Sequence, residues 1–288
     1  MTGRALGVAV GVAIALVASM GCATTSEYAR FAQAGSSYAA ALDHLLVAAG
    51  TVGVDATSER LLQDDAVKNQ DLASYQSLNA IDADRLATID RLRTHARLLS
   101  LYFGLLGDLA ETRSPERIQS AITGVADSLN RLGTQLRQGP FVGNAIGAGD
   151  AARLVVSARV KAALKHELEE RKETIRLELT TQEVLLGKLS QAIAHDLSIV
   201  RSAREQRLVI NPLTDTSPIT RPDDWIANRR KILTSQSTLE ELARGSDAGA
   251  ELRRAFEELI SGRASLARLD ALLTSVDGLL AVAASITR

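Results

Sequence analysis

The C-terminal part of the chain repeats apolar residues every seven positions, and this spacing limits the possible fold more than any other sequence feature. Leucine fills one position of each repeat and small or apolar residues fill the partner position: Leu252, Leu259, Leu266, Leu273 and Leu280, with Ala255, Gly262, Leu269, Val276 and Ala283. A heptad places these side chains along one face of a helix, where they pack against another helix. The pattern predicts one unbroken helix through this region, in contact with a helical neighbour.

The helical period continues through almost the whole chain, and no run of alternating residues predicts a strand. A second heptad runs through Leu179, Leu186, Ile193 and Val200. Caps, glycines and prolines divide the remainder into expected helices at 27–49, 79–112, 115–138, 150–208 and 222–245, with short helical pieces between 57 and 77. We therefore expect an all-α protein, an elongated antiparallel helical bundle with long heptad-patterned helices.

The predicted helix ends depend on a few residues. Gly50 and Gly53 are expected to stop the first helix, and Asn79 and Asp150 are expected to cap later ones. Two segments without helical pattern, 139–149 and 211–222, are candidate breaks within a single domain over residues 22–288. Both are equally typical of turns inside one bundle.

Composition narrows the classes of partner. The net charge is −1, so it implies neither nucleic acid nor an anionic membrane surface as a partner. Aromatic residues are scarce, which weakens any nucleic-acid interpretation further. Cys22 is the only cysteine, so an intrachain disulfide is excluded and stability must come from helix packing.

The N-terminal residues 1–21 have the pattern of a secretory signal. Arg4 precedes an uncharged apolar run that ends at Met20, and Gly21 leads into Cys22. The run is too short for a comfortable membrane-spanning helix. This end resembles the signal of bacterial lipoproteins, in which the cysteine is acylated and becomes the first residue of the mature protein.

The resemblance implies lipidation of Cys22 and attachment to a membrane. Because Ala23 and Thr24 follow the cysteine where an Asp would retain the protein, it further implies an outer-membrane location facing the periplasm. Ser19 stands where lipoprotein signals usually carry Leu. Ordinary secretion and a retained anchor are the alternatives.

Motifs for chemistry are missing from the sequence. Glu170 stands where a zinc HExxH motif beginning at His166 needs its second histidine. The sequence has no G-x-S-x-G nucleophile motif and no P-loop. We therefore expect no catalytic residues, no metal and no cofactor, although a buried cluster of His95, His166 or His195 with carboxylates would revive an enzyme.

Two basic clusters flank the segment 211–222. One contains Arg201, Arg204 and Arg207, and the other contains Arg229, Arg230 and Lys231. They could form one positive end of the bundle that binds an anionic lipid headgroup or a glycan phosphate. The first cluster has an ordinary explanation too, because cations are favourable near a helix C-terminus.

Two apolar segments exceed what a plain bundle needs. The loop 139–149 contains Pro140, Phe141, Val142 and Ile146, which are candidate contacts with a partner or a membrane. The segment 98–106 (LLSLYFGLL) is also nearly uncharged. The alternative is that both segments are buried inside the bundle.

These observations give three hypotheses for function. The first is a membrane-tethered, non-enzymatic helical lipoprotein that acts as a scaffold or partner-binding module with an envelope protein. The second is a membrane-active protein that resembles helical pore-forming toxins in general plan and inserts the loop 139–149. An enzyme is the third, and the oligomeric state stays open.

Overall fold

A computed structural model describes residues 25–66, 71–112, 115–138, 160–245 and 247–286. These residues are almost entirely helical, and no strand occurs among them. The helices are α1 (Thr25–Ala66), α2 (Leu72–Glu111), α3 (Pro115–Gln138), α4 (Val160–Glu170), α5 (Lys172–Glu205), the π-helix η2 (Gln206–Ile210), α6 (Asn211–Thr214), α7 (Pro222–Gly245), α8 (Ala248–Ile260) and α9 (Leu266–Ile286). The predicted all-α bundle is confirmed.

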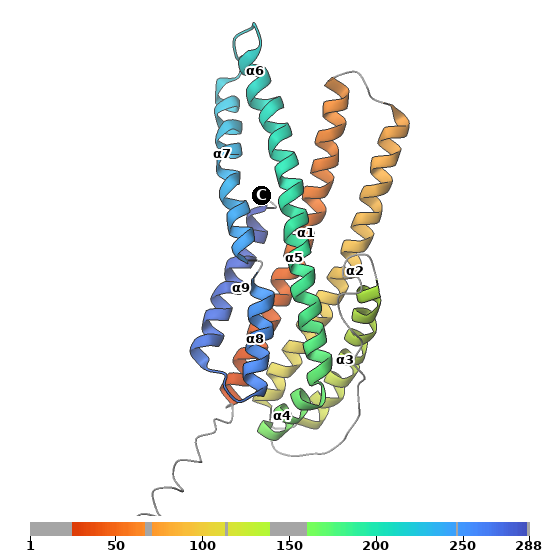
Figure 1. Ribbon diagram of the computed structural model, residues 1–288, viewed down its shortest axis with the longest axis vertical. Coiled ribbons are helices and arrows are strands. Elements are labelled where there is room, and N and C mark those ends of the chain that lie inside the picture. The colour runs from red at the N-terminus through yellow and green to blue at the C-terminus, as the bar shows by residue number, and fades with distance from the viewer. Residues whose placement is uncertain (1–24, 67–70, 113–114, 139–159, 246, 287–288) are drawn as a thin grey trace, which may run out of the picture.

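The bundle is elongated, and α1 runs along most of its length (Figure 1). We call the end where α1 begins the proximal end, and the end where α1 finishes the distal end. Helices α3, α4 and α8 and most of α9 lie in the proximal half, and the described part of the distal half consists of α1, α2, α5 to α7 and the end of α9 (Figure 1). Neighbours α1 and α2 are antiparallel, as are α5 and α7.

Helix α1 passes through both glycines that were expected to stop it. It extends to Ala66, so the prediction of an end at Gly50 and of only short helical pieces after residue 57 is wrong. A Cβ at Gly50 would lie 3.1 Å from Leu86 Cδ2 of α2. The glycines therefore allow α2 to approach α1 closely, and this packing outweighs their low helix propensity.

Helix α2 also begins earlier than expected. Asp71 is its N-cap and accepts a hydrogen bond from the Ser74 backbone N–H at 2.5 Å, so Asn79 lies inside the helix and is not a cap. Of the helix predicted over 150–208, the start at Asp150 lies outside the described residues. The described part is interrupted at Arg171, between α4 and α5.

The heptad of α5 is confirmed, because Leu179, Leu186, Ile193 and Val200 are all buried. Helix α5 continues through η2 and α6 as far as Thr214, so the loop expected from residue 211 begins only at Asp215. Pro212 explains the π-helical turn before it. A proline ring clashes with the carbonyl four residues earlier, and a wider turn relieves that clash.

The unbroken C-terminal helix is a wrong prediction. Residues 261–265 form a turn, and α8 and α9 pack against each other on either side of it. Gly262 lies at the start of the turn with φ of 69°, a left-handed conformation that ends helices. Leu266, one of the heptad leucines, is 45% exposed at the start of α9.

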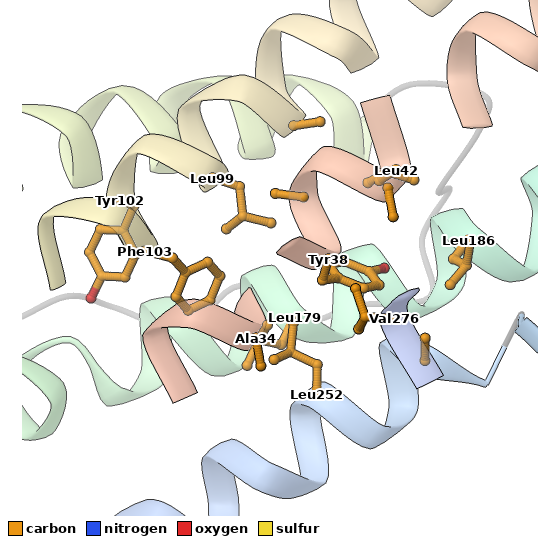
Figure 2. Close-up of a cluster of buried hydrophobic side chains, with 14 of the residues drawn as sticks. Ala34, Tyr38, Leu42, Leu99, Tyr102, Phe103, Leu179, Leu186, Leu252 and Val276 are labelled. Atoms are coloured by element: carbon orange, nitrogen blue, oxygen red, sulfur yellow. The ribbon is translucent and has the colours of Figure 1, made fainter. Parts of the chain in front are cut away.

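The core forms where α1 packs against α2, α5, α8 and α9. Figure 2 shows side chains of these helices converging on Tyr38 and Phe103. Phe31 of α1 contacts Phe103 of α2 edge to face, with ring centroids 5.6 Å apart, and Phe256 of α8 at 6.0 Å. Burial of these rings joins the first helices of the chain to the last ones.

The apolar segment 98–106 belongs to this core. Leu99, Tyr102, Phe103 and Leu106 are buried, and Leu101 is half-exposed. Of the two interpretations given for the segment, burial in the bundle therefore holds for most of it. Two helices of the described part, Ser26–Gln63 and Leu266–Ile286, are long and apolar enough to cross a membrane. Core helices of bundles commonly meet the same test.

Candidate functional site

The residues that the sequence singled out for attachment and contact are not described by the structure. Cys22 precedes the first described residue, and Pro140, Phe141, Val142 and Ile146 fall within the undescribed range 139–159. Lipidation and contact at these positions stay predictions. The described residues contain two unusual regions.

The first region is the distal half, where the bundle separates into two arms. The first arm consists of residues 54–66 of α1 and 71–88 of α2, and the second consists of residues 204–214 and 222–233. In α2, every residue from Leu72 to Thr88 is exposed or half-buried, whereas Ile89 begins a buried stripe. The arms therefore extend past the core, and residues 72–88 of α2 have no buried face there.

Apolar side chains are exposed on both arms. All the large apolar side chains of the described residues that are more than half exposed lie there: Leu72, Tyr75, Ile81, Leu213 and Leu233. Leu72 is 69% exposed and Leu213 is 60% exposed. Apolar surface gathered at one end of a protein is typical of a contact surface.

A cluster of four charged residues joins the two arms. We call Asp55 and Glu59 of α1 with Arg204 and Arg207 of the second arm the distal ion cluster. Glu59 Oε1 accepts from Arg204 Nε at 2.9 Å and from Arg207 Nη2 at 2.7 Å, and Arg204 Nη2 also donates to Asp55 Oδ2 at 2.7 Å. Glu59 is buried, whereas both arginines are about a third or more exposed.

The electrostatics of the distal ion cluster favour the charged form of Glu59. Burial alone would raise the pKa of this carboxyl, but hydrogen bonds from Arg207 and Arg204 and their positive charges hold its pKa below the ordinary value. Arg204 and Arg207 are therefore paired with carboxylates of α1. The positive end expected from the first basic cluster is largely neutralised within the chain.

The sequence contained a signal for the acidic half of this cluster. Asp55 and Glu59 are four residues apart, and Arg204 and Arg207 are three apart, so each pair lies on one helix face. The two pairs can be matched only when α1 continues past residue 57, and the sequence predicts only short helical pieces there.

A pocket of about 340 Å³ lies beside the distal ion cluster, and Asp55 and Arg204 of that cluster line it. It is bounded by α1, α5 with η2, α7 and the C-terminal end of α9, which stops about halfway along the bundle (Figure 1). Arg201, Arg204 and Lys231 line it, so the structure brings members of both basic clusters to one cavity. Arg229 and Arg230 are exposed on α7.

The second unusual region is a polar network buried in the proximal half. His95 of α2 has no exposed surface, and its Nε2 lies 2.9 Å from Oε2 of the buried Glu178 of α5. Glu178 Oε1 accepts from Arg137 of α3 at 2.8 Å. The side-chain nitrogen of Gln182 lies 3.0 Å from His95 Nδ1, and Tyr38 donates to the Gln182 carbonyl.

This network contains the kind of buried histidine–carboxylate pair that would favour an enzyme. If Gln182 donates to Nδ1, the His95 proton is on Nε2 and points toward Glu178. The cavity that touches Glu178 holds about 20 Å³, room for about one water molecule. The network is a polar connection between α2, α3 and α5.

The other histidines are placed differently. His44 and His195 are exposed, and His166 Nε2 lies 3.5 Å from Oε2 of Glu170 on the same helix. No group of three or more histidine, cysteine or acidic residues among the described residues is arranged to hold a metal ion.

Comparisons of the chain with models of protein families, with curated proteins and with solved structures find no match.

Proposed function

We propose that this protein is a non-enzymatic scaffold of the bacterial cell envelope, tethered to the outer membrane through a lipidated Cys22 and binding a partner protein with its distal arms. The observation that carries the proposal is the position of the exposed apolar side chains. Among the described residues, the five that are more than half exposed all lie on the two arms, in the half of the bundle opposite Thr25, where α1 begins. A tether just before Thr25 would hold the proximal end at the membrane and leave the arms accessible.

The dimensions of α1 support this arrangement. A helix rises 1.5 Å per residue, so the 42 residues of α1 reach about 63 Å from the proximal end. The arms would therefore meet a partner well away from the lipid surface. An anchor with several acyl chains holds a protein firmly, whereas a single chain binds only marginally.

The chemistry of the arms indicates the kind of partner. On the second arm, the exposed Leu233 follows the exposed basic residues Arg229, Arg230 and Lys231. A protein surface with an apolar ridge beside acidic side chains fits this combination. We expect such a partner to be an envelope protein.

The tether and the partner surface are tested separately. Cys22→Ser should release the mature protein from membranes, and continued membrane association would contradict the tether. For the arms, a C-terminally tagged protein is crosslinked in native envelopes, purified and analysed by mass spectrometry. Leu72→Ser combined with Leu213→Ser should remove a stoichiometric partner.

Leu101→Ser is the matched control, because Leu101 is also half-exposed on α2 but lies in the proximal half. It should keep the partner. Equal loss in both variants, or recovery of the protein alone, would contradict binding by the arms. If the protein is recovered alone, dye release from liposomes and its loss in Phe141→Asp would test the membrane-active alternative.

A further inference from the structure

We infer that the pocket between α1, α5, α7 and the end of α9 binds an amphipathic anion, a carboxylate with a medium-length acyl chain. The described lining of this pocket includes none of the five apolar side chains that are more than half exposed on the arms, although it shares Lys231 with the second arm. Its volume of about 340 Å³ falls in the range of small-molecule pockets, roughly 300–1,000 Å³. At about 30 Å³ for each water-sized group, it accommodates roughly eleven such groups, the size of octanoate or decanoate.

One wall of the pocket is apolar. Leu197 and Val200 of α5, Leu208 of η2, Ile232 of α7 and Ile286 of α9 contribute to it. Val200 and Ile232 are buried and fixed within their helices. Such a wall takes up the acyl chain, because transfer of methylene groups out of water is favourable.

The charged lining of the pocket is mainly positive. Asp55 is the acidic residue among its described lining, and that carboxylate already accepts a hydrogen bond from Arg204. Lys231 of α7 and Arg201 of α5 contribute further positive charge. The lining therefore favours an anionic headgroup over a cationic one.

Polar groups beside Lys231 complete a headgroup site. Asn228 precedes Lys231 by one helical turn on α7, and Ser235 follows it by one turn, so all three lie along one face. An ammonium and an amide can both donate to a carboxylate, and charge-assisted hydrogen bonds are the strong ones. Cations beside the C-terminal end of α9 also stabilise that helix, so stability must be measured as well as binding.

The test is isothermal titration calorimetry of the mature protein with decanoate below its micelle concentration. Decanol and decyltrimethylammonium, which carry the same chain, serve as uncharged and cationic probes. We expect saturable binding of decanoate only. Lys231→Met should weaken it by about tenfold, the effect of losing one charge-assisted hydrogen bond.

Two further variants keep the test decisive. Arg230→Met makes the same charge change at the next exposed position of α7, outside the pocket, and should bind decanoate like the unaltered protein. Ser235→Phe fills the pocket and should abolish binding while thermal unfolding shows an intact fold. If the Ser235→Phe protein unfolds, Thr238→Met is the substitute variant.

Equal binding of the three probes, equal loss in Lys231→Met and Arg230→Met, or no saturable binding would each overturn the inference. Cys22→Ser should leave decanoate binding unchanged.

Discussion

Glu59 is the residue on which the two arms converge. Its carboxylate is buried and accepts hydrogen bonds from both Arg204 and Arg207, so its charge is balanced only while the arms stay together. The pKa of Glu59 is held below the ordinary value of 4.5 by these two arginines. A group with a lowered pKa in the folded state adds stability above its unfolded pKa, and this contribution is lost as the pH falls through the folded pKa.

Glu59→Gln should therefore destabilise the protein at neutral pH and much less in acid. We expect a loss of about 1.5–3 kcal/mol at pH 7, the value typical of hydrogen bonds to charged groups. The difference between the two proteins should shrink as the pH falls below about 4.5, where Glu59 is protonated in the unfolded state, and disappear below the lower pKa of the folded state. Urea unfolding at a series of pH values measures it.

Glu111→Gln is the control for this prediction, because Glu111 is exposed at the end of α2. Its effect should stay within about 0.5 kcal/mol, as for most surface substitutions. A loss in Glu59→Gln that is equal at pH 3 and pH 7 would show that the charge of Glu59 is not what stabilises the arms.

Two residues of the buried network in the proximal half, His95 and Gln182, could be predicted from the sequence to make buried hydrogen bonds. His95 lies in the buried stripe between Leu92 and Leu99, and Gln182 lies between Leu179 and Leu186. A polar residue inside an apolar stripe predicts a buried hydrogen bond, because an unpaired polar group there is costly. The partner could not be predicted, since Glu178 and Arg137 come from helices whose relative placement depends on the whole fold.

At the scale of the elements, the turn between α8 and α9 divides the heptad that dominates the sequence. Gly262 adopts φ of 69°, and its N–H donates to the Leu259 carbonyl, while the N–H groups of Arg263 and Ala264 donate to the carbonyl of Glu258. These bonds satisfy carbonyls that the helix end leaves unpaired.

Gly262→Ala should destabilise the protein by about 1–2 kcal/mol, because a side chain disfavours the left-handed conformation by roughly that amount. Gly262→Asn should lose less, since asparagine tolerates this conformation better. Thermal unfolding of the two variants compares them. Equal stability of Gly262→Ala and the unaltered protein would mean that the turn rearranges without strain.

The heptad explains why this turn was not predicted. Leu259 and Leu266 are seven residues apart on opposite sides of the turn, so the repeat keeps its phase across a break in the helix. Gly262 occupies a heptad position, where a small residue is equally typical of the seam between two helices. Local periodicity predicted the buried face of α5 correctly, because one helix determines its face by itself.

Tertiary packing decided the other helix ends. Gly50 and Gly53 each cost about 1 kcal/mol in a helix, but contact with α2 keeps α1 helical through them. The pocket had no local signal either. It exists because α9 stops beside Ile232 and Leu197 while α1, α5 and α7 continue, and no single segment encodes that difference in length.

At the scale of the whole molecule, packing is uneven from end to end. The proximal half surrounds α1 with α2, α5, α8 and α9, whereas each distal arm is a helix pair that shares few buried side chains. Stability in such a molecule is expected to differ between the two halves, since segments with few buried contacts open more easily.

Amide hydrogen exchange should show this difference within a single helix. Residues 72–88 of α2 should exchange much faster than residues 89–109, and residues 222–231 of α7 should exchange faster than the remainder of that helix. The boundary should fall near Ile89, where burial begins. Uniform protection along α2 would indicate that another contact covers the arm in solution.

The central position of α1 affects how the protein folds during synthesis. Arg30, near the start of the chain, bonds to Asp270, which is synthesised 240 residues later. The ring of Phe31 likewise stays partly uncovered until Phe256 has been synthesised and packs against it. Contacts between such distant residues form slowly, and a growing chain exposes apolar surface until they do. Of the described helices, α1 therefore leaves the ribosome first, yet it is fully enclosed only after α8 and α9 have been synthesised.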